Sequence, residues 1–248
     1  MFAKQLPVVN CTVLKYVGPV TPRDSQSAQT AFAREVFRSH AQFIKDHRFR
    51  VVSLDQVARA FSGGARLPER AVAITFEGVS LFSDAIGDIV KANELPVTVF
   101  VDPRYNEPEQ LCARLSQLRS RGVLIGHHVV IERSPMELLS VPTEEQVTAS
   151  KVELEQLLGE AVDHAAYAFD VLLGTERKFL GRLGYKTAST VATAMAGIHL
   201  DPYSIRQCAI SEQDDNARFG WKLWRSGAKP AFGRAPAMAM SSPQTANA

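Results

Sequence analysis

Apolar residues along the chain follow two patterns: short apolar runs, and longer segments whose apolar positions recur three or four residues apart. The runs are typical of buried strands and the spaced segments of amphipathic helices. The predicted strands are 7–17, 49–54, 70–76, 95–102, 123–128, 166–169 and 185–190. The predicted helices are 25–47, 55–61, 80–94, 108–122, 142–160 and 174–184.

Strand and helix alternate at intervals of about 25 residues, a pattern that indicates parallel strands joined by crossover helices. The sequence therefore predicts an α/β sheet or barrel, formed by a single domain over residues 1–229. From Pro230 the chain is rich in Ala, Pro, Ser and Met without any period. We expect residues 230–248 to form a flexible tail, or an arm that a partner orders.

Titratable side chains follow several of the predicted strands at their carboxyl ends. Glu77 and Asp102 end two of the apolar runs, His127 and His128 end a third, and Asp170 follows a fourth. Parallel strands of an α/β fold bring their carboxyl ends to one edge, where ligands and catalytic groups lie. Each residue alone is more often a cap or a loop side chain, so the hypothesis of a site depends on their joint placement.

Composition and charge exclude some classes of protein. The 248 residues carry a formal net charge of +2, and no basic run is interleaved with aromatics, so we expect no nucleic-acid partner. No run of 18 apolar residues occurs, and the first residues lack a continuous apolar segment, so we expect no membrane span and a cytoplasmic protein. The cysteines, Cys11, Cys112 and Cys208, form no metal or redox motif.

The order of these segments resembles the polysaccharide deacetylases of the NodB-homology type, which are metal-dependent N-deacetylases of amino-sugar polymers. The resemblance runs from about Val13 to Arg225. It rests on "RVVSLDQVARAFSGGARLPERAVAITFEG", "LSQLRSRGVLIGHHVVIE", "LGYKTAST" and "DPYSIRQCAI". It implies a distorted (β/α) barrel of about seven parallel strands, often incomplete.

The family's first two motifs are altered in this chain. Thr-Phe-Asp-Asp-Gly stands as "TFEGV" at 75–79, so the resemblance places the catalytic base on Glu77 and a metal-binding aspartate on Gly78, which has no side chain. His-x-x-x-His stands as "HVVIE" at 128–132, so His128 is kept as a metal ligand and Glu132 replaces the second histidine. These changes imply a degraded metal triad.

Other positions of the family's groove correspond only loosely. The third motif stands as "YAFD" at 167–170, without the family's arginine and prolines. The resemblance makes His127 and His199 candidates for the acid–base histidine. Aromatic side chains suit the faces of sugar rings, and the remaining candidates for saccharide binding come from the third motif and the segments that enter the groove. These candidates are Tyr105, Tyr167, Phe169, Asp170, Asp201, Tyr203 and Arg206.

Three functions remain open. The first is a deacetylase-fold protein of carbohydrate metabolism that binds an N-acylated sugar or glycan and is catalytically weak or inactive. The second is an active hydrolase of a sugar N-acyl amide, with Zn, Mn or Fe held by Glu77, His128 and Glu132, a donor set that suits a hard metal. The third is a non-catalytic scaffold whose tail contacts a partner or a second copy of the chain. The sequence does not decide whether a metal is bound.

Overall fold

In a computed structural model, structure is described for residues 9–17, 26–105, 108–129, 143–167, 179–190, 198–199 and 201–227. The strands are β1 Val9–Asn10, β2 Thr12–Tyr16, β3 Arg50–Val51, β4 Ala71–Glu77, β5 Val97–Val101, β6 Leu124–Val129, β7 His164–Tyr167, β8 Thr187–Thr190, β9 Ile198–His199, β10 Ile205–Arg206 and β11 Cys208–Ile210. The helices are α1 Gln26–Asp46, α2 Leu54–Phe61, α3 Asp84–Ala92, α4 Pro108–Ser120, α5 Glu144–Leu158 and α7 Asn216–Arg225, with 3-10 turns η2 Val79–Leu81 and η3 Pro103–Tyr105. The predicted tail, 230–248, lies outside the described residues.

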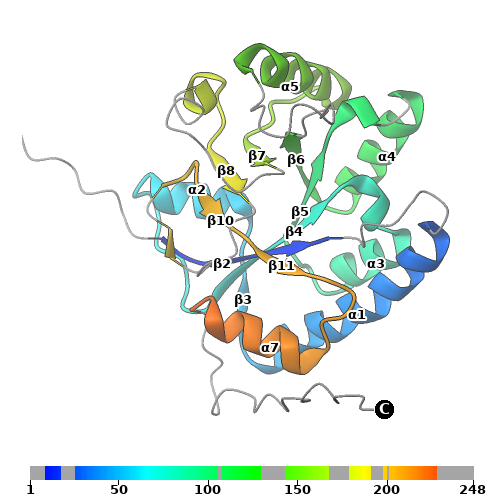
Figure 1. The fold of residues 1–248 in the computed structure, drawn as a ribbon, viewed down its shortest axis with the longest axis vertical. Helices are drawn as coiled ribbons and strands as arrows, with labels where there is room; N and C mark the ends of the chain where they lie inside the picture. Colours follow the sequence, from blue (N-terminus) through cyan, green and yellow to red (C-terminus); the bar gives the residue numbers. More distant parts are fainter. Residues whose placement is uncertain are drawn as a thin grey trace, which may run out of the picture.

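The predicted parallel α/β barrel is confirmed. Eight strands follow one another in the order β10-β8-β7-β6-β5-β4-β2-β11, and every neighbouring pair is parallel. The two ends of this path, β10 and β11, are separated in the chain only by Gln207, so one extended segment bridges both edges and nearly closes the barrel (Figure 1). Of the seven strands predicted from the sequence, six lie on this path and the seventh, 49–54, contains β3, which pairs with β4 beside it; β10 and β11 were not predicted.

Apolar side chains form a layer on each side of the barrel wall. An outer cluster includes Ile74, Val99 and Ile125 and packs against helices on the outside, among them α1, α3, α4 and α7. An inner cluster includes Val13, Ala73 and Phe100 together with residues of α2, such as Val57. Helix α2 thus covers the amino ends of the strands, and the carboxyl ends are left for a site.

Local capping explains where several helices begin. The hydroxyl of Ser53 accepts a hydrogen bond from the backbone N–H of Gln56, and the side-chain oxygen of Gln56 accepts one from the backbone N–H of Ser53. This pair of bonds makes α2 start at Leu54. The Ser83 hydroxyl caps α3 by accepting a hydrogen bond from the backbone N–H of Ile86, so this helix starts at Asp84 and is shorter than the predicted 80–94. The sequence pattern did not predict α7, which Asp215 caps.

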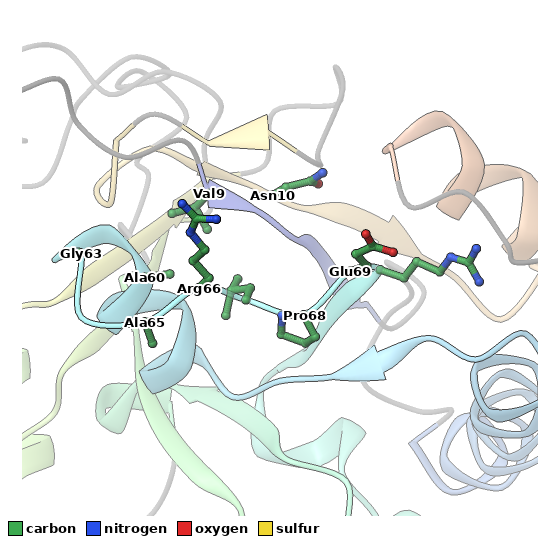
Figure 2. A pocket seen from close by; sticks show the side chains of 10 residues that line it. Val9, Asn10, Ala60, Gly63, Ala65, Arg66, Pro68 and Glu69 are labelled. Atoms are coloured by element: carbon green, nitrogen blue, oxygen red, sulfur yellow. The ribbon is translucent and has the colours of Figure 1, made fainter.

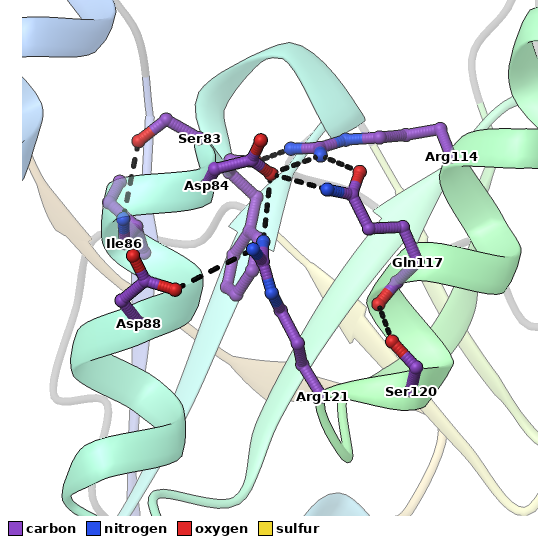
Figure 3. A network of polar contacts seen from close by, with 9 residues as sticks. Ser83, Asp84, Ile86, Asp88, Arg114, Gln117, Ser120 and Arg121 are labelled. Atoms are coloured by element: carbon purple, nitrogen blue, oxygen red, sulfur yellow. Dashed lines mark hydrogen bonds and ion pairs between the residues drawn. The ribbon is translucent and has the colours of Figure 1, made fainter.

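Polar contacts join α3 to α4 on the outside of the barrel, as Figure 3 shows. One oxygen of Asp84 accepts hydrogen bonds from Arg114, Gln117 and Arg121, each at 2.8 Å. The bonds from Arg114 and Arg121 lower the pKa of Asp84. Among the described residues, every helix is too short or too polar to cross a membrane.

Candidate functional site

The alternation of side chains along the strands decides which residues face the barrel interior. In β4, Ala71 and Ala73 belong to the inner cluster, while Ile74 and Phe76 pack outward against helices. The same period of two places Glu77 on the inner face at the end of the strand. By the same alternation Lys15 of β2, Asp102 after β5 and His128 of β6 also face inward.

These inner residues meet at the carboxyl end of the barrel. The ammonium Nζ of Lys15 lies 2.8 Å from Oε1 of Glu77, and Nε2 of His128 lies 3.9 Å from Oε2 of the same carboxylate. Asp102 is close enough to act electrostatically on His128. We call Lys15, Glu77, Asp102, Arg104 and His128 the carboxyl-end cluster.

Asp102 is held by its neighbour in η3. Its Oδ1 accepts hydrogen bonds from the backbone N–H and from Nε of Arg104, both at 3.0 Å, and its Oδ2 lies 2.6 Å from Nη2. The guanidinium therefore binds the carboxylate through two parallel contacts, the strongest geometry for such a pair. Each of the two carboxylates in the cluster is thus paired with its own cation.

His128 differs from its surroundings because its Nε2 is buried and has no hydrogen-bond partner among the described residues. Burial lowers the pKa of His128, and the opposing attraction of Glu77 and Asp102 is the smaller influence. A neutral imidazole with a free ring nitrogen can donate to or accept from a ligand, depending on its tautomer.

Unsatisfied polar atoms continue down the barrel interior below the cluster. The Nε2 of Gln207, on the bridging segment, donates to Thr75 Oγ1 at 3.2 Å, while its Oε1 is buried and without a hydrogen-bond partner in the described part of the chain. Ser189 Oγ of β8 is in the same situation. Buried polar atoms normally take hydrogen bonds, so an interior of this kind suits water or a polar ligand.

The second predicted histidine lies on the other side of the barrel wall. His127 is fully buried against α5, where its Nδ1 shares a hydrogen bond with the Tyr185 hydroxyl and its Nε2 one with the Ser150 hydroxyl. Burial lowers the pKa of His127 to about 3. The structure does not bring it into the cluster, because adjacent residues of a strand point to opposite faces.

The structure does not bring four of the predicted saccharide contacts into the cluster either. Tyr167 is buried in an apolar cluster with Val129 and Leu180, outside the barrel. Asp201 accepts a hydrogen bond from the Tyr203 backbone, and the Tyr203 hydroxyl donates to the Tyr185 carbonyl, at the amino ends of β8 and β10. Arg206 is exposed on β10.

The remaining predicted residues cannot be placed in the site. Glu132, Phe169 and Asp170 lie outside the described residues. Tyr105 and His199 have described backbones in η3 and β9 but no described side chains. Of the predicted set, Glu77 and His128 are therefore the two side chains that the described structure brings together.

The described donors do not fit a catalytic divalent metal. Such an ion commonly needs three protein ligands, and no group of three His, Cys, Asp or Glu side chains that could hold a metal occurs in the described ranges. The ammonium of Lys15 already lies against Glu77. The backbone of Gly78 has φ +94°, where residues with a Cβ are strained, so an aspartate at this position would not be accommodated easily.

Sequence reasoning missed Lys15 and Arg104. A lysine in the middle of "CTVLKYV" breaks an apolar strand at an inward position, and this break is a signal that could have found it. Arg104 follows Asp102 by two residues in a turn, which was the available signal for their pairing. Neither residue corresponds to a motif of the family, so the resemblance did not point to them.

Two open pockets lie at the opposite end of the barrel. One, of about 640 Å³, is lined by the end of α2, by Val9 and Asn10 of β1 and by the loop that carries Arg66 and Glu69 (Figure 2). The other, of about 600 Å³, lies between α2 and the turn of Tyr203. Both are at the amino ends of the strands, away from the carboxyl-end cluster, so size alone does not identify the site. Pairing and burial of polar groups favour the cluster.

Solved structures with a similar fold include deacetylases. The deacetylase PplD of Streptococcus pyogenes, in complex with acetate, is 18% identical, with 89% of this chain and 99% of that chain covered and a TM-score of 0.67. IcaB from Ammonifex degensii is 14% identical, with 88% and 97% covered and a TM-score of 0.65. A polysaccharide deacetylase from Bacillus cereus is 13% identical, with 88% and 69% covered and a TM-score of 0.61.

These likenesses assign a fold class. The chain has the NodB-like polysaccharide deacetylase fold, over most of its length. No family model matches the sequence, and no curated protein matches it. Identities below one fifth do not transfer an activity, so function has to be argued from the carboxyl-end cluster itself.

Proposed function

We propose that this protein binds an N-acylated saccharide at the carboxyl-end cluster and hydrolyses its acyl amide weakly or not at all. The observation that carries the proposal is the buried Nε2 of His128, which has no hydrogen-bond partner among the described residues and lies 3.9 Å from a Glu77 carboxylate that Lys15 already neutralises. The free nitrogen offers a hydrogen bond to a ligand. A carboxylate that is already held in an ion pair is a poor ligand for a metal.

The chemistry of the cluster suits an N-acyl group. An amide carbonyl accepts hydrogen bonds from an ammonium or an imidazole N–H, and its N–H donates to a carboxylate. Lys15, His128 and Glu77 supply these three functions within a few ångströms of one another. The similar fold of a deacetylase in complex with acetate supports a small acyl group as the part of the ligand that enters.

Binding and hydrolysis can be tested separately with N-acetylglucosamine oligomers. We expect calorimetry to detect binding to the wild-type protein, and His128→Ala to weaken it by at least tenfold. Acetate release should stay near background with or without added Zn²⁺ or Mn²⁺. Asp55→Asn, at the amino end of the barrel, is the control and should bind as the wild type does.

The alternative, an active metal-dependent hydrolase, predicts the opposite pattern. Acetate release would then depend on one metal ion per chain and would be lost with Glu132→Ala. Absence of binding to any N-acetylated oligomer, in a protein that unfolds cooperatively, would rule out the proposed function.

A further inference from the structure

The charges in the carboxyl-end cluster are already balanced without an added ion. Lys15 pairs with Glu77, and Arg104 pairs with Asp102. Burial lowers the pKa of His128 and so disfavours a further positive charge there. Among the described residues of the cluster, the two carboxylates are matched by two cations and leave no net negative charge to attract a divalent metal.

Lys15 lies in a place where a lysine is costly. Its side chain is 5% exposed, and it projects from the middle of the barrel wall into the interior. A buried ammonium is retained only where it is paired, because the loss of hydration is large. In the described part of the chain its ion-pair partner is Glu77, which makes the two residues one unit.

The ammonium also lies against Oε1, one of the two oxygens through which Glu77 could bind a metal. A metal–carboxylate bond is about 2.0–2.6 Å long, and Nζ lies 2.8 Å from Oε1, so an ion bound to this oxygen would lie against a like charge. Next to Glu77, Gly78 supplies no side-chain oxygen and has a backbone, at φ +94°, that an aspartate would adopt only with strain. These two features act in the same direction and are independent of one another.

We propose that Lys15 is the resident cation of this site and stands in place of a divalent metal. It holds Glu77 and presents its remaining N–H donors to an oxygen of the ligand. The class of ligand follows: an uncharged acyl carbonyl or a carboxylate, bound without a metal. The replacement of a metal ion by the Lys15 ammonium, which we call the exchange of charge, does not require that the ligand is a sugar. The inference rests on the proposed function only where it identifies the bound oxygen as part of a sugar's acyl group.

Metal titration tests the exchange directly. Wild-type protein and the control Lys15→Arg, which keeps the charge, should show no Zn²⁺ site that depends on His128. Lys15→Met removes the charge and leaves a carboxylate beside an imidazole as two protein ligands, so it should bind one Zn²⁺ per chain at least tenfold more tightly than the wild type, with water completing the coordination. The added change His128→Ala should abolish that gain.

Two results would overturn the proposal. One is a wild-type site of one Zn²⁺ per chain that His128→Ala removes. The other is a Lys15→Met protein that keeps a cooperative unfolding transition and gains no metal. Lys15→Gln, which keeps the length and polarity of the side chain, serves the same purpose if Lys15→Met does not fold.

A second measurement separates this proposal from the proposed function. Lys15→Met should weaken binding of an N-acetylglucosamine oligomer at least tenfold, whereas Lys15→Arg should weaken it less. If the oligomer does not bind to the wild-type protein but Lys15→Met gains zinc, the proposed function fails and the exchange of charge stands. If the oligomer binds and no variant gains zinc, the proposed function stands and the exchange fails.

Discussion

The two ends of the barrel each hold a histidine beside a carboxylate, and they differ in how fully the hydrogen bonds of these groups are satisfied. At the amino end, His164 is fully buried, with Nε2 at 3.1 Å from Asp55 Oδ1 and Nδ1 at 2.8 Å from Thr187 Oγ1. At the carboxyl end, His128 is 3.9 Å from Glu77 and has a buried nitrogen without a hydrogen-bond partner among the described residues.

The amino end therefore holds a structural contact between a helix and the barrel, whereas the carboxyl end holds a candidate binding site. Asp55 belongs to the first turn of α2, so the bonds of His164 attach that helix to the floor of the barrel. A satisfied network of this kind stabilises the fold and offers nothing to a ligand. At the carboxyl end, His128 Nε2 is buried without a hydrogen-bond partner among the described residues, which lowers the stability of the fold and leaves this atom available to a ligand.

The largest test of this comparison is the loss of stability on truncating each histidine. His164→Ala leaves a cavity and an unpaired Thr187 hydroxyl, and should lower the free energy of unfolding by about 3 kcal/mol. His128→Ala removes a ring with no such partner to lose, and should cost about 1 kcal/mol or less. Urea unfolding of both variants measures the difference, and equal losses would contradict the distinction between the two ends.

A pH series extends the comparison to His127 of β6, whose two ring nitrogens are also both hydrogen-bonded. Because burial disfavours the imidazolium, the folded chain leaves His127 unprotonated from the ordinary pKa of 6.5 down to about 3. The unfolded chain takes up that proton. The free energy of unfolding should therefore fall with decreasing pH in this window, with a contribution from His127 of about 1.4 kcal/mol per pH unit.

His127→Gln removes this titration and should reduce the pH slope by that amount. The slope is measured by urea unfolding between pH 6.5 and pH 4.5. Ser150→Ala is the control, because it removes the bond to Nε2 yet keeps the buried imidazole. Its stability should be lower at every pH, with the slope unchanged. A His127→Gln slope equal to that of the wild type would mean that this histidine titrates alike in both states.

The sequence predicted the barrel because its signals are local. Unbroken apolar runs such as 70–76 can only be strands that are covered on both faces, and their spacing leaves room for one crossover helix each. Helix α7 was missed although its sequence, "NARFGWKLWR", is amphipathic, because it lies beyond the repeating strand–helix units. It forms because Asp215 caps it and Phe219 and Leu223 bury one face.

The candidate site was predictable only where alternation along a strand could be read. Strand ends correctly grouped Glu77 with His128, but the choice between His127 and His128 depends on a register of one residue, and only the structure supplies it. Lys15 enters from β2, roughly 60 residues earlier in the chain than Glu77, so no local pattern joins them. Ion pairs between residues far apart in the chain are therefore the part of this site that the sequence alone could not predict.

The smallest effect concerns the carboxylate at the amino end. The hydrogen bond from His164 lowers the pKa of Asp55, so its contribution is complete above the unfolded carboxyl pKa of 3.8 and is lost as the pH falls through the lower folded value. The side chain is 43% exposed, and solvent screening limits the contribution to about 0.5–1 kcal/mol. Asp55→Asn should lose this amount at pH 7 and nothing at a pH below the folded pKa, as urea unfolding at both pH values would show.

The matched control is Asp84→Asn, which breaks contacts to Arg114 and Arg121 on the outer surface and should cost less, since none of its partners is buried as His164 is. A larger loss for Asp84→Asn would mean that the number of charged partners, and not the burial of one of them, decides what a carboxylate contributes to this barrel.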